Sequence, residues 1–257
     1  MHPSLADWMT IAHGLCGYGG LVLLAGAWRA HPGAHGVPIA QLRVIALFVA
    51  VGALLDLFDG PVARRFGSSG MGEPLDAICD AVTFGLLPGA VVAVSGVGDR
   101  RLGGAVLIGA GGIYFVAMIL RLVRSWMTSA EALGAGFQGM PSAPAGSATI
   151  AVVGLGASPA VTALLIALLA MLLIGNFAFP RQRAGLMPIM AGGPTIGLLG
   201  LWGVLPLRPA MIAAMILAIA PVAAARAGVR RRRALSIPTP GPEIAPSAID
   251  LGTGPSA

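Results

Sequence analysis

The residues best suited to chemistry are four aspartates, Asp56, Asp59, Asp76 and Asp80, which share one short stretch of an otherwise apolar chain. Charged residues make up only 10% of the sequence, and long hydrophobic segments flank this stretch on both sides. The first two aspartates are three residues apart and the last two are four apart, so on helices each pair occupies one face. Carboxylates at the edge of apolar segments cost free energy, and function is the usual reason for keeping them.

The chemistry expected of these carboxylates is divalent-metal binding. If the two helices pack as neighbours, the four side chains converge and repel one another by a few kcal/mol each, at about 4 Å and an effective dielectric constant of about 20. A divalent cation relieves that repulsion, and oxygen ligands without histidine or cysteine favour Mg²⁺ or Mn²⁺ over zinc. Four carboxylates can hold two such ions about 4 Å apart, an arrangement suited to phosphoryl transfer.

The residues between the two pairs of aspartates also fit a phosphate ligand. Gly60 removes a side chain where a ligand would approach, and Arg64 can donate two hydrogen bonds to one phosphate. The loop at residues 67–70 offers backbone amides. The alternative is an interfacial loop whose acids merely pair with Arg64, Arg65 and Arg121. The combined pattern of aspartates, glycines and arginine favours the ligand site.

Composition and hydropathy place the chain in a membrane. It has 257 residues, 56% of them hydrophobic, and a mean hydropathy of +0.87. Such apolar runs are typical of membrane-spanning helices, so we expect an all-α integral membrane protein, a bundle of about eight helices. The net charge of +6 comes from arginines between apolar runs, which indicate topology and not nucleic-acid binding. The expected spans cover residues 8–28, 40–58, 74–97, 102–122, 143–157, 160–179, 187–205 and 209–225.

The arginines also predict the orientation of the chain. An even number of spans puts both termini on one side, together with the acidic stretch and most of the arginines. The positive-inside rule assigns that side to the cytoplasm, so we expect a multi-pass protein of the cell (inner) membrane. This count depends on a break at Ser158-Pro159. The run Arg230–Arg233 is expected to contact anionic lipid, and the tail beyond it to be disordered.

The acidic stretch resembles the signature of the CDP-alcohol phosphotransferase family of membrane enzymes, also called CDP-alcohol phosphatidyltransferases. That signature is DxxDGxxAR, eight residues, and then GxxxDxxxD. Seven residues separate Arg64 from Gly72 here. The resemblance implies a six-helix core within residues 1–180. The apolar runs beyond it predict two additional spans at 181–229, and the composition predicts a basic, disordered tail at 230–257. The motif positions are occupied by Asp56, Asp59, Gly60, Ala63, Arg64, Gly72, Asp76 and Asp80.

The resemblance also implies a reaction. Family members move a substituted phosphate from a CDP-linked donor such as CDP-diacylglycerol to an alcohol and release CMP, a step of phospholipid biosynthesis. By this resemblance Asp56, Asp59 and Asp76 hold the metals, and Asp80 at their edge is also the general base. Thr10 either lies near the nucleotide or is a plain helix-surface residue. A homodimer is implied as well. The implied CDP contacts are Gly60, Ala63, Arg64, Ser69 and Gly72.

Several weaker motifs are similar to the phosphatidylserine synthase branch, among them Leu120–Trp126 (LRLVRSW), Phe137–Gly146 (FQGMPSAPAG) and Thr83–Gly89 (TFGLLPG). They favour L-serine as the alcohol, with Arg121 and Arg124 binding the acceptor carboxylate or the donor phosphate. Alternatively, both arginines only reach the membrane interface. Glycerol phosphate, inositol phosphate or a specialised alcohol stay open as acceptors. A transporter or cation channel is a further alternative, which the position of the aspartates at the membrane boundary disfavours.

Overall fold

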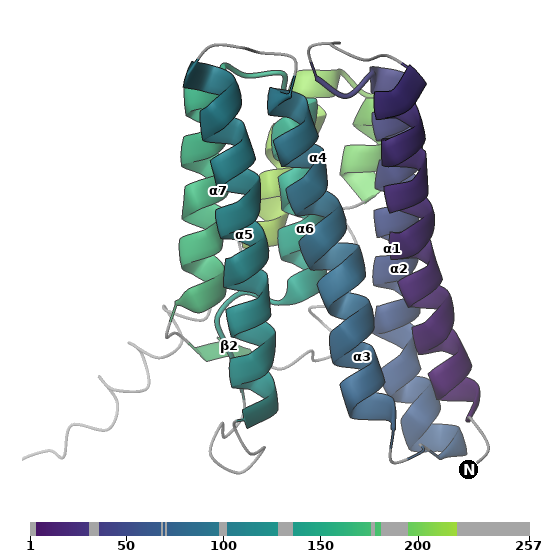
Figure 1. Cartoon of the computed structure of the whole chain (residues 1–257). Coiled ribbons are helices and arrows are strands. Elements are labelled where there is room, and N and C mark those ends of the chain that lie inside the picture. Colours follow the sequence, from purple (N-terminus) through teal and green to yellow (C-terminus); the bar gives the residue numbers. More distant parts are fainter. Residues whose placement is uncertain are drawn as a thin grey trace, which may run out of the picture.

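The described part of the chain is a bundle of helices that run side by side (Figure 1). It is known from a computed structural model, which describes residues 4–30, 36–67, 69, 71–97, 102–127, 136–175, 178–180 and 195–219. A π-helical segment, η1 (Ala81–Leu86), joins α3 to α4, and a further helix covers Leu207–Ile219. The main helices are α1 (Leu5–Ala30), α2 (Ile39–Phe66), α3 (Gly72–Asp80), α4 (Leu87–Gly96), α5 (Leu102–Met127), α6 (Ser142–Gly154) and α7 (Pro159–Ile174).

The expected all-α class agrees with these residues, apart from one small sheet. Strands β1 (Gly136–Gln138) and β2 (Ala178–Pro180) pair antiparallel over three residues each. Within the described ranges, four helical segments are long and apolar enough to cross a membrane, namely α1, α2, the continuous run Gly72–Gly96, and α5. Helices α7 and Leu207–Ile219 are apolar but shorter. The count of about eight spans is therefore not confirmed.

Of two helix boundaries expected from the sequence, one differs in the structure and one agrees. The second span was expected to end at Phe58, but α2 continues to Phe66 and carries the whole first half of the aspartate motif. Hydropathy marks the apolar part of a helix, whereas backbone hydrogen bonding continues into polar sequence. The expected break near Ser158-Pro159 is confirmed, because α6 ends at Gly154 and α7 begins at Pro159. Proline suits that first helical position, where its missing N–H has no partner to lose.

Small residues allow the helices around the acidic stretch to pack closely. A Cβ atom on Gly14 of α1 would lie 2.6 Å from the sulfur of Cys79 on α3, so only glycine fits there. A Cβ atom on Gly111 of α5 would collide with the carbonyl oxygen of Gly89 on α4. Helices in lipid associate through such close backbone approach. The packing brings α3 and η1 against α1, and η1 also against α2.

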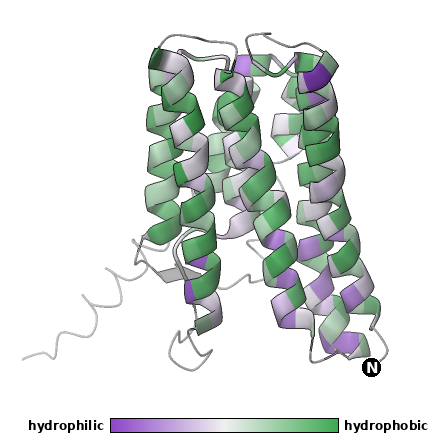
Figure 2. Ribbon diagram, in the orientation of Figure 1, coloured by the Kyte–Doolittle hydropathy of each residue, from purple (hydrophilic) through white to green (hydrophobic). Residues whose placement is uncertain are grey.

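Polar side chains gather at one end of this bundle. Figure 2 shows them on the ends of α1, α2 and α3 nearest the labelled N-terminus, below long apolar helical stretches. The segment η1 lies just beyond that polar end, and its backbone is held by neighbours. The Tyr114 hydroxyl of α5 donates a hydrogen bond to the carbonyl oxygen of Phe84 at 2.8 Å. Because π-helical turns often occur at functional sites, the adjoining Asp80 is placed where a site is expected.

Candidate metal centre and substrate cavity

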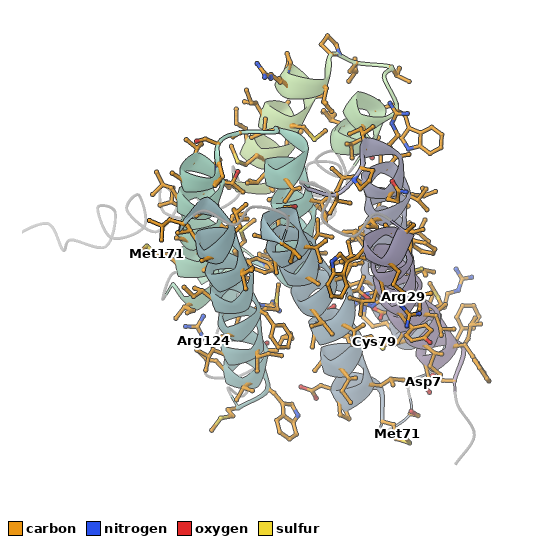
Figure 3. The ribbon with its side chains drawn as sticks, turned by 45° about the horizontal axis from the view of Figure 1, so that its top comes forward. Asp7, Arg29, Met71, Cys79, Arg124 and Met171 are labelled. Atoms are coloured by element: carbon orange, nitrogen blue, oxygen red, sulfur yellow. The ribbon has the colours of Figure 1, made fainter. Side chains whose placement is uncertain are left out.

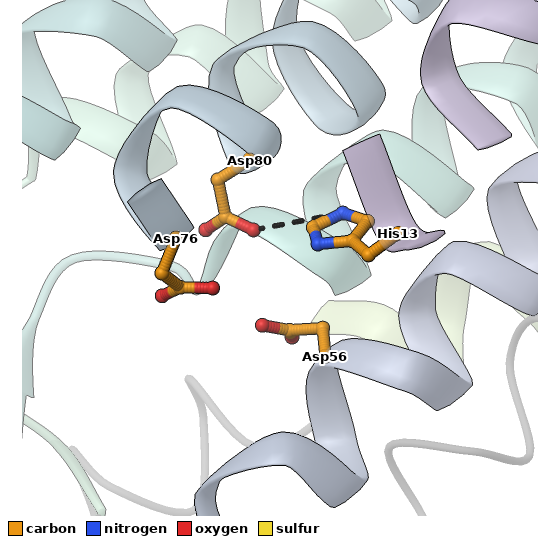
Figure 4. Close-up of side chains that lie close together, drawn as sticks. All are labelled: His13, Asp56, Asp76 and Asp80. Carbon is orange, nitrogen blue, oxygen red and sulfur yellow. Dashed lines mark ion pairs between the residues drawn. The ribbon is translucent and has the colours of Figure 1, made fainter. Parts of the chain in front are cut away.

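Three of the four motif aspartates meet at the polar end of the bundle, together with one histidine. Asp56 of α2, Asp76 and Asp80 of α3, and His13 of α1 each offer one ligand atom, and these atoms all lie within 4.8 Å of one another. Figure 4 shows the His13 ring facing a carboxylate oxygen of Asp80, with Asp56 and Asp76 beside them. We call these four side chains the ligand cluster.

The ligand cluster contains buried polar atoms with no hydrogen-bond partner among the described residues. These atoms are Oδ1 of Asp76, Oδ1 of Asp80 and both ring nitrogens of His13. Buried oxygens and nitrogens are normally paired, and leaving them unpaired is destabilising. Carboxylate oxygens that face one another without a donor instead match the needs of a divalent cation. The donor set therefore fits a bound metal ion.

The other oxygen of Asp80 is held by polar neighbours. The hydroxyl of Ser142, at the start of α6, donates a hydrogen bond to Oδ2 of Asp80 at 2.5 Å. A guanidinium nitrogen of Arg121 on α5 lies 3.9 Å from the same oxygen. Asp80 is 5% exposed and Arg121 7% exposed, so this contact is shielded from water. These contacts orient the Asp80 carboxylate so that its Oδ1 points toward the other members of the ligand cluster.

Asp59 lies outside the ligand cluster as the structure describes it. Its Oδ2 accepts a hydrogen bond at 3.1 Å from the hydroxyl of Thr10 on α1. Thr10 is buried, 4% exposed, and so is not a plain surface residue of its helix. Asp59 is only partly buried, and it borders the cluster on the side of α1.

The expected CDP contacts line the polar end of α2 and the turn before α3. Gly60 and Ala63 are half-buried on α2, and Arg64 is exposed near its end. The hydroxyl of Ser69 accepts a hydrogen bond from the backbone N–H of Met71 at 3.2 Å. A Cβ atom on Gly60 would meet only the Arg64 guanidinium, at 3.5 Å, among described atoms. The space beside Gly60 is thus open as far as the described residues show.

A cavity of about 340 Å³ adjoins the ligand cluster. Three aspartates of the cluster line it, and apolar residues of α2 and α5 form much of the rest of its wall. Arg121 is the one arginine among its described lining residues. Its Nε atom is buried and has no hydrogen-bond partner among those residues. Besides these, the polar part of the wall consists of Glu73, Ser125, Ser142 and Thr195.

Arg124, the second arginine expected to bind substrate, is directed elsewhere. Its guanidinium donates hydrogen bonds to backbone carbonyl oxygens at the end of α7, at 2.6 Å to Ile174, 3.3 Å to Leu173 and 3.4 Å to Gly175. The last carbonyls of a helix have no helical partners and carry partial negative charge. Figure 3 shows Arg124 on α5, well apart from Cys79 and Asp7. Arg124 does not line the cavity.

The same end of α7 also holds the segment that leads to Ser142. The backbone N–H of Met140 donates to the carbonyl oxygen of Leu172 at 3.0 Å, and β1 pairs with β2 just before it. Gly139 has φ +79°, a conformation that favours glycine. We call Arg124, Gly139, Met140 and these carbonyls the α7 clamp. It fixes the approach of the chain to Ser142.

Two residues of the site were not identified from the sequence. The sequence does not predict His13 as a ligand, because no metal-ligand spacing connects it to the aspartates. Its position within an apolar span is nevertheless a signal of a functional site. Ser142 was noted only as part of a branch motif. It is 62 positions from its partner Asp80, so only the packing of α6 against η1, which directly follows Asp80, shows the contact.

Comparison with known proteins identifies the family of this chain. Its sequence matches the family described as CDP-alcohol phosphatidyltransferase over residues 4–229. It is 35% identical over 85 residues to a CDP-diacylglycerol–serine O-phosphatidyltransferase of Mycobacterium leprae (strain TN). Those 85 residues are 33% of this chain and 27% of that protein. It is 40% identical over 55 residues to the Bacillus subtilis (strain 168) protein of the same name, 21% of this chain and 31% of that protein. These two matches cover less than a third of either relative. The family match extends over well over half of the chain, which therefore belongs to the CDP-alcohol phosphatidyltransferase family.

Proposed function

We propose that this multi-pass membrane protein transfers the phosphatidyl group of CDP-diacylglycerol to L-serine and releases CMP. The observation that carries the proposal is the ligand cluster, in which one oxygen each of Asp76 and Asp80 has no hydrogen-bond partner among the described residues. The cluster adjoins a cavity whose described lining includes one arginine. The family supports the CDP-linked donor. The relatives named above support serine, since both are serine phosphatidyltransferases by name.

The aspartates are assigned to metal and diphosphate binding. Asp56, Asp59 and Asp76 would hold Mg²⁺ or Mn²⁺, with Asp80 adjoining. When bound, such ions neutralise the diphosphate and stabilise CMP as the leaving group. The chain itself presents Gly60 and Arg64 beside these carboxylates, so that the phosphates of CDP can approach the backbone closely and accept hydrogen bonds from the guanidinium. Ala63, Ser69 and Gly72 complete the proposed CDP surface.

Asp80 is assigned as the general base. The serine hydroxyl oxygen attacks the phosphorus of the phosphatidyl group, the bond from that phosphorus to the CMP oxygen breaks, and Asp80 takes the hydroxyl proton. Ser142 and Arg121 hold Oδ2 of Asp80, which orients the carboxylate. A carboxylate has about four lone-pair sites, so Asp80 can adjoin a metal and still accept a proton.

Arg121 is assigned to the acceptor carboxylate. It is buried at the cavity wall, and its Nε–H lacks a partner among the described residues. One guanidinium suits the single carboxylate of serine. A phosphorylated acceptor such as glycerol phosphate or inositol phosphate carries more negative charge and calls for more cations. Arg124 supplies none, because it is bonded to α7, and Arg181 lies outside the described residues.

Several wider expectations accompany this proposal. We propose that the active site and both termini face the cytoplasm at the cell (inner) membrane, as the arginine distribution indicates. We also propose a homodimer, as the family resemblance implies. The division into a core at 1–180, two further spans at 181–229 and a tail at 230–257 stays a prediction.

The test is CMP release by the purified full-length protein in lipid–detergent micelles with CDP-diacylglycerol and Mn²⁺ or Mg²⁺. L-Serine, glycerol 3-phosphate, inositol 1-phosphate and myo-inositol are offered one at a time. We expect serine-dependent CMP release and a phosphatidylserine product. Release with another alcohol and none with serine would overturn the choice of acceptor. Release with none of these acceptors, from folded protein, contradicts the proposed reaction.

A further inference from the structure

We infer that His13 is a nitrogen ligand of a divalent cation at the ligand cluster, beside Asp56, Asp76 and Asp80, and that it makes the site prefer Mn²⁺ over Mg²⁺. The inference deepens the proposed function and rests on it only in taking a divalent metal to bind at the ligand cluster. Mg²⁺ prefers oxygen ligands, whereas imidazole suits later divalent metals. One nitrogen among oxygens therefore changes which ion the site favours.

The burial of His13 is the first observation in support. Its side chain is 0% exposed, and neither ring nitrogen has a hydrogen-bond partner in the part of the chain that the structure describes. An ordinary buried histidine donates one ring N–H and accepts at the other nitrogen. Metal coordination gives a lone pair of the neutral ring a partner that no described residue supplies.

The direction of the ring is the second observation. Nε2 of His13 lies 3.9 Å from Oδ1 of Asp80, beyond hydrogen-bond distance. That oxygen and Oδ1 of Asp76 are themselves buried without a donor. The nitrogen and the two oxygens face one another across the centre of the cluster (Figure 4). Acceptors so arranged repel one another unless a proton or a cation lies among them.

The neighbours of His13 hold its ring in this orientation. The ring packs against Phe84 of η1, with centroids 4.9 Å apart and planes tilted by 32°. The hydroxyl of Thr83 donates to the backbone carbonyl of His13 at 3.1 Å. A Cβ atom on Gly52 of α2 would lie 3.1 Å from Cδ2 of the ring. Contacts from α2 and η1 thus hold the ring of a residue carried by α1 in one orientation.

The decisive measurement is the electron spin echo modulation of Mn²⁺ bound to the full-length, tag-free protein in detergent, without nucleotide and in a nitrogen-free buffer. A directly bound imidazole nitrogen produces ¹⁴N modulation. We expect it in the unmodified protein and in a control in which His2, His31 and His35 are all replaced by glutamine. We expect it to be lost in His13→Asn. Absence of ¹⁴N modulation from the Mn²⁺-loaded unmodified protein, or its persistence in His13→Asn, would overturn the inference.

Metal selectivity provides a second readout of the same inference. In His13→Asn, whose folding is checked by its melting temperature, Mn²⁺ affinity should fall about tenfold or more, the scale on which metal sites respond to lost support. Mg²⁺ affinity should fall less, because an amide oxygen can replace the nitrogen as a ligand. Equal losses for both ions contradict the claimed selectivity. Should His13→Asn fail to fold, the spectra of the unmodified and three-histidine proteins still decide the ligand.

The two proposals fail in different ways. CMP release with serine but no ¹⁴N modulation removes His13 from the metal site and leaves the proposed function intact. Nitrogen modulation in a folded protein that releases no CMP with any offered alcohol removes the proposed function and leaves His13 as a metal ligand.

Discussion

Arg121 and Arg124 lie on one helix, α5, yet they belong to two regions of opposite character. Arg121 reaches the ligand cluster and its cavity, where oxygens of Asp76 and Asp80 are buried without a hydrogen-bond partner among the described residues. Arg124 belongs to the α7 clamp, where its guanidinium bonds three backbone carbonyls. Satisfied polar groups stabilise a fold, whereas buried groups without partners are costly unless a ligand satisfies them. The contrast separates the proposed binding region from a region that stabilises the packing of the helices.

The largest effect is expected at the centre of the ligand cluster. Asp80→Asn removes the proposed base with little change of shape, and CMP release should fall about 10²- to 10⁴-fold. The melting temperature should stay the same or rise, because a carboxylate is removed from a group of like charges. Both are measured on the detergent-purified variant. Near-normal CMP release would remove Asp80 from the chemistry.

The next largest effect is expected on the serine KM, and it distinguishes Arg121 from Arg124. Arg121→Gln should raise the serine KM about 10- to 100-fold, since a hydrogen bond to a charged group contributes about 1.5–3 kcal/mol. The KM for CDP-diacylglycerol should change less. Arg124→Gln is the matched control on the same helix, and its serine KM should stay close to that of the unmodified protein. Equal increases in both variants would contradict the division between cavity and clamp.

The two arginine variants should rank in the opposite order when their stability is compared. Arg124→Gln removes hydrogen bonds to the end of α7 and should lower the free energy of unfolding by about 1–2 kcal/mol, seen as a lower melting temperature in detergent. Arg121→Gln should lower it less, because the ion pair of Arg121 with Asp80 among the described residues is a long one, 3.9 Å. A clamp that is irrelevant to folding would leave the melting temperature of Arg124→Gln unchanged.

The smallest effect is expected where the two regions meet. Ser142→Ala removes the hydroxyl that orients Asp80 but keeps the start of α6, and kcat should fall about tenfold, equivalent to about 1.4 kcal/mol. Ser142→Thr, which restores the hydroxyl, should recover part of the loss if the crowded site accepts its methyl group. An increase in the serine KM with kcat unchanged would indicate instead that Ser142 binds the acceptor.

Local sequence patterns predicted the helical class and the stretch that carries the site. They could not predict which side chains face one another, because helix rotation depends on packing between distant segments. Asp59 illustrates the difference: its spacing from Asp56 suggested one shared face, but Thr10 on α1, 49 positions away, accounts for its described side-chain contact. The end of the second helix was also beyond hydropathy, because hydropathy does not show how far a helix continues into polar sequence.

The sequence by itself determined the aspartate motif, its place at the edge of apolar helices and the resemblance to a family that the comparison with known proteins confirms. Spacing and hydropathy are local properties, so they can be read directly from the order of residues. Only the tertiary structure decided that His13 and Ser142 meet Asp80 and that Arg124 turns away to α7. Those contacts arise where glycine-lined helices pack closely enough to bring distant side chains together.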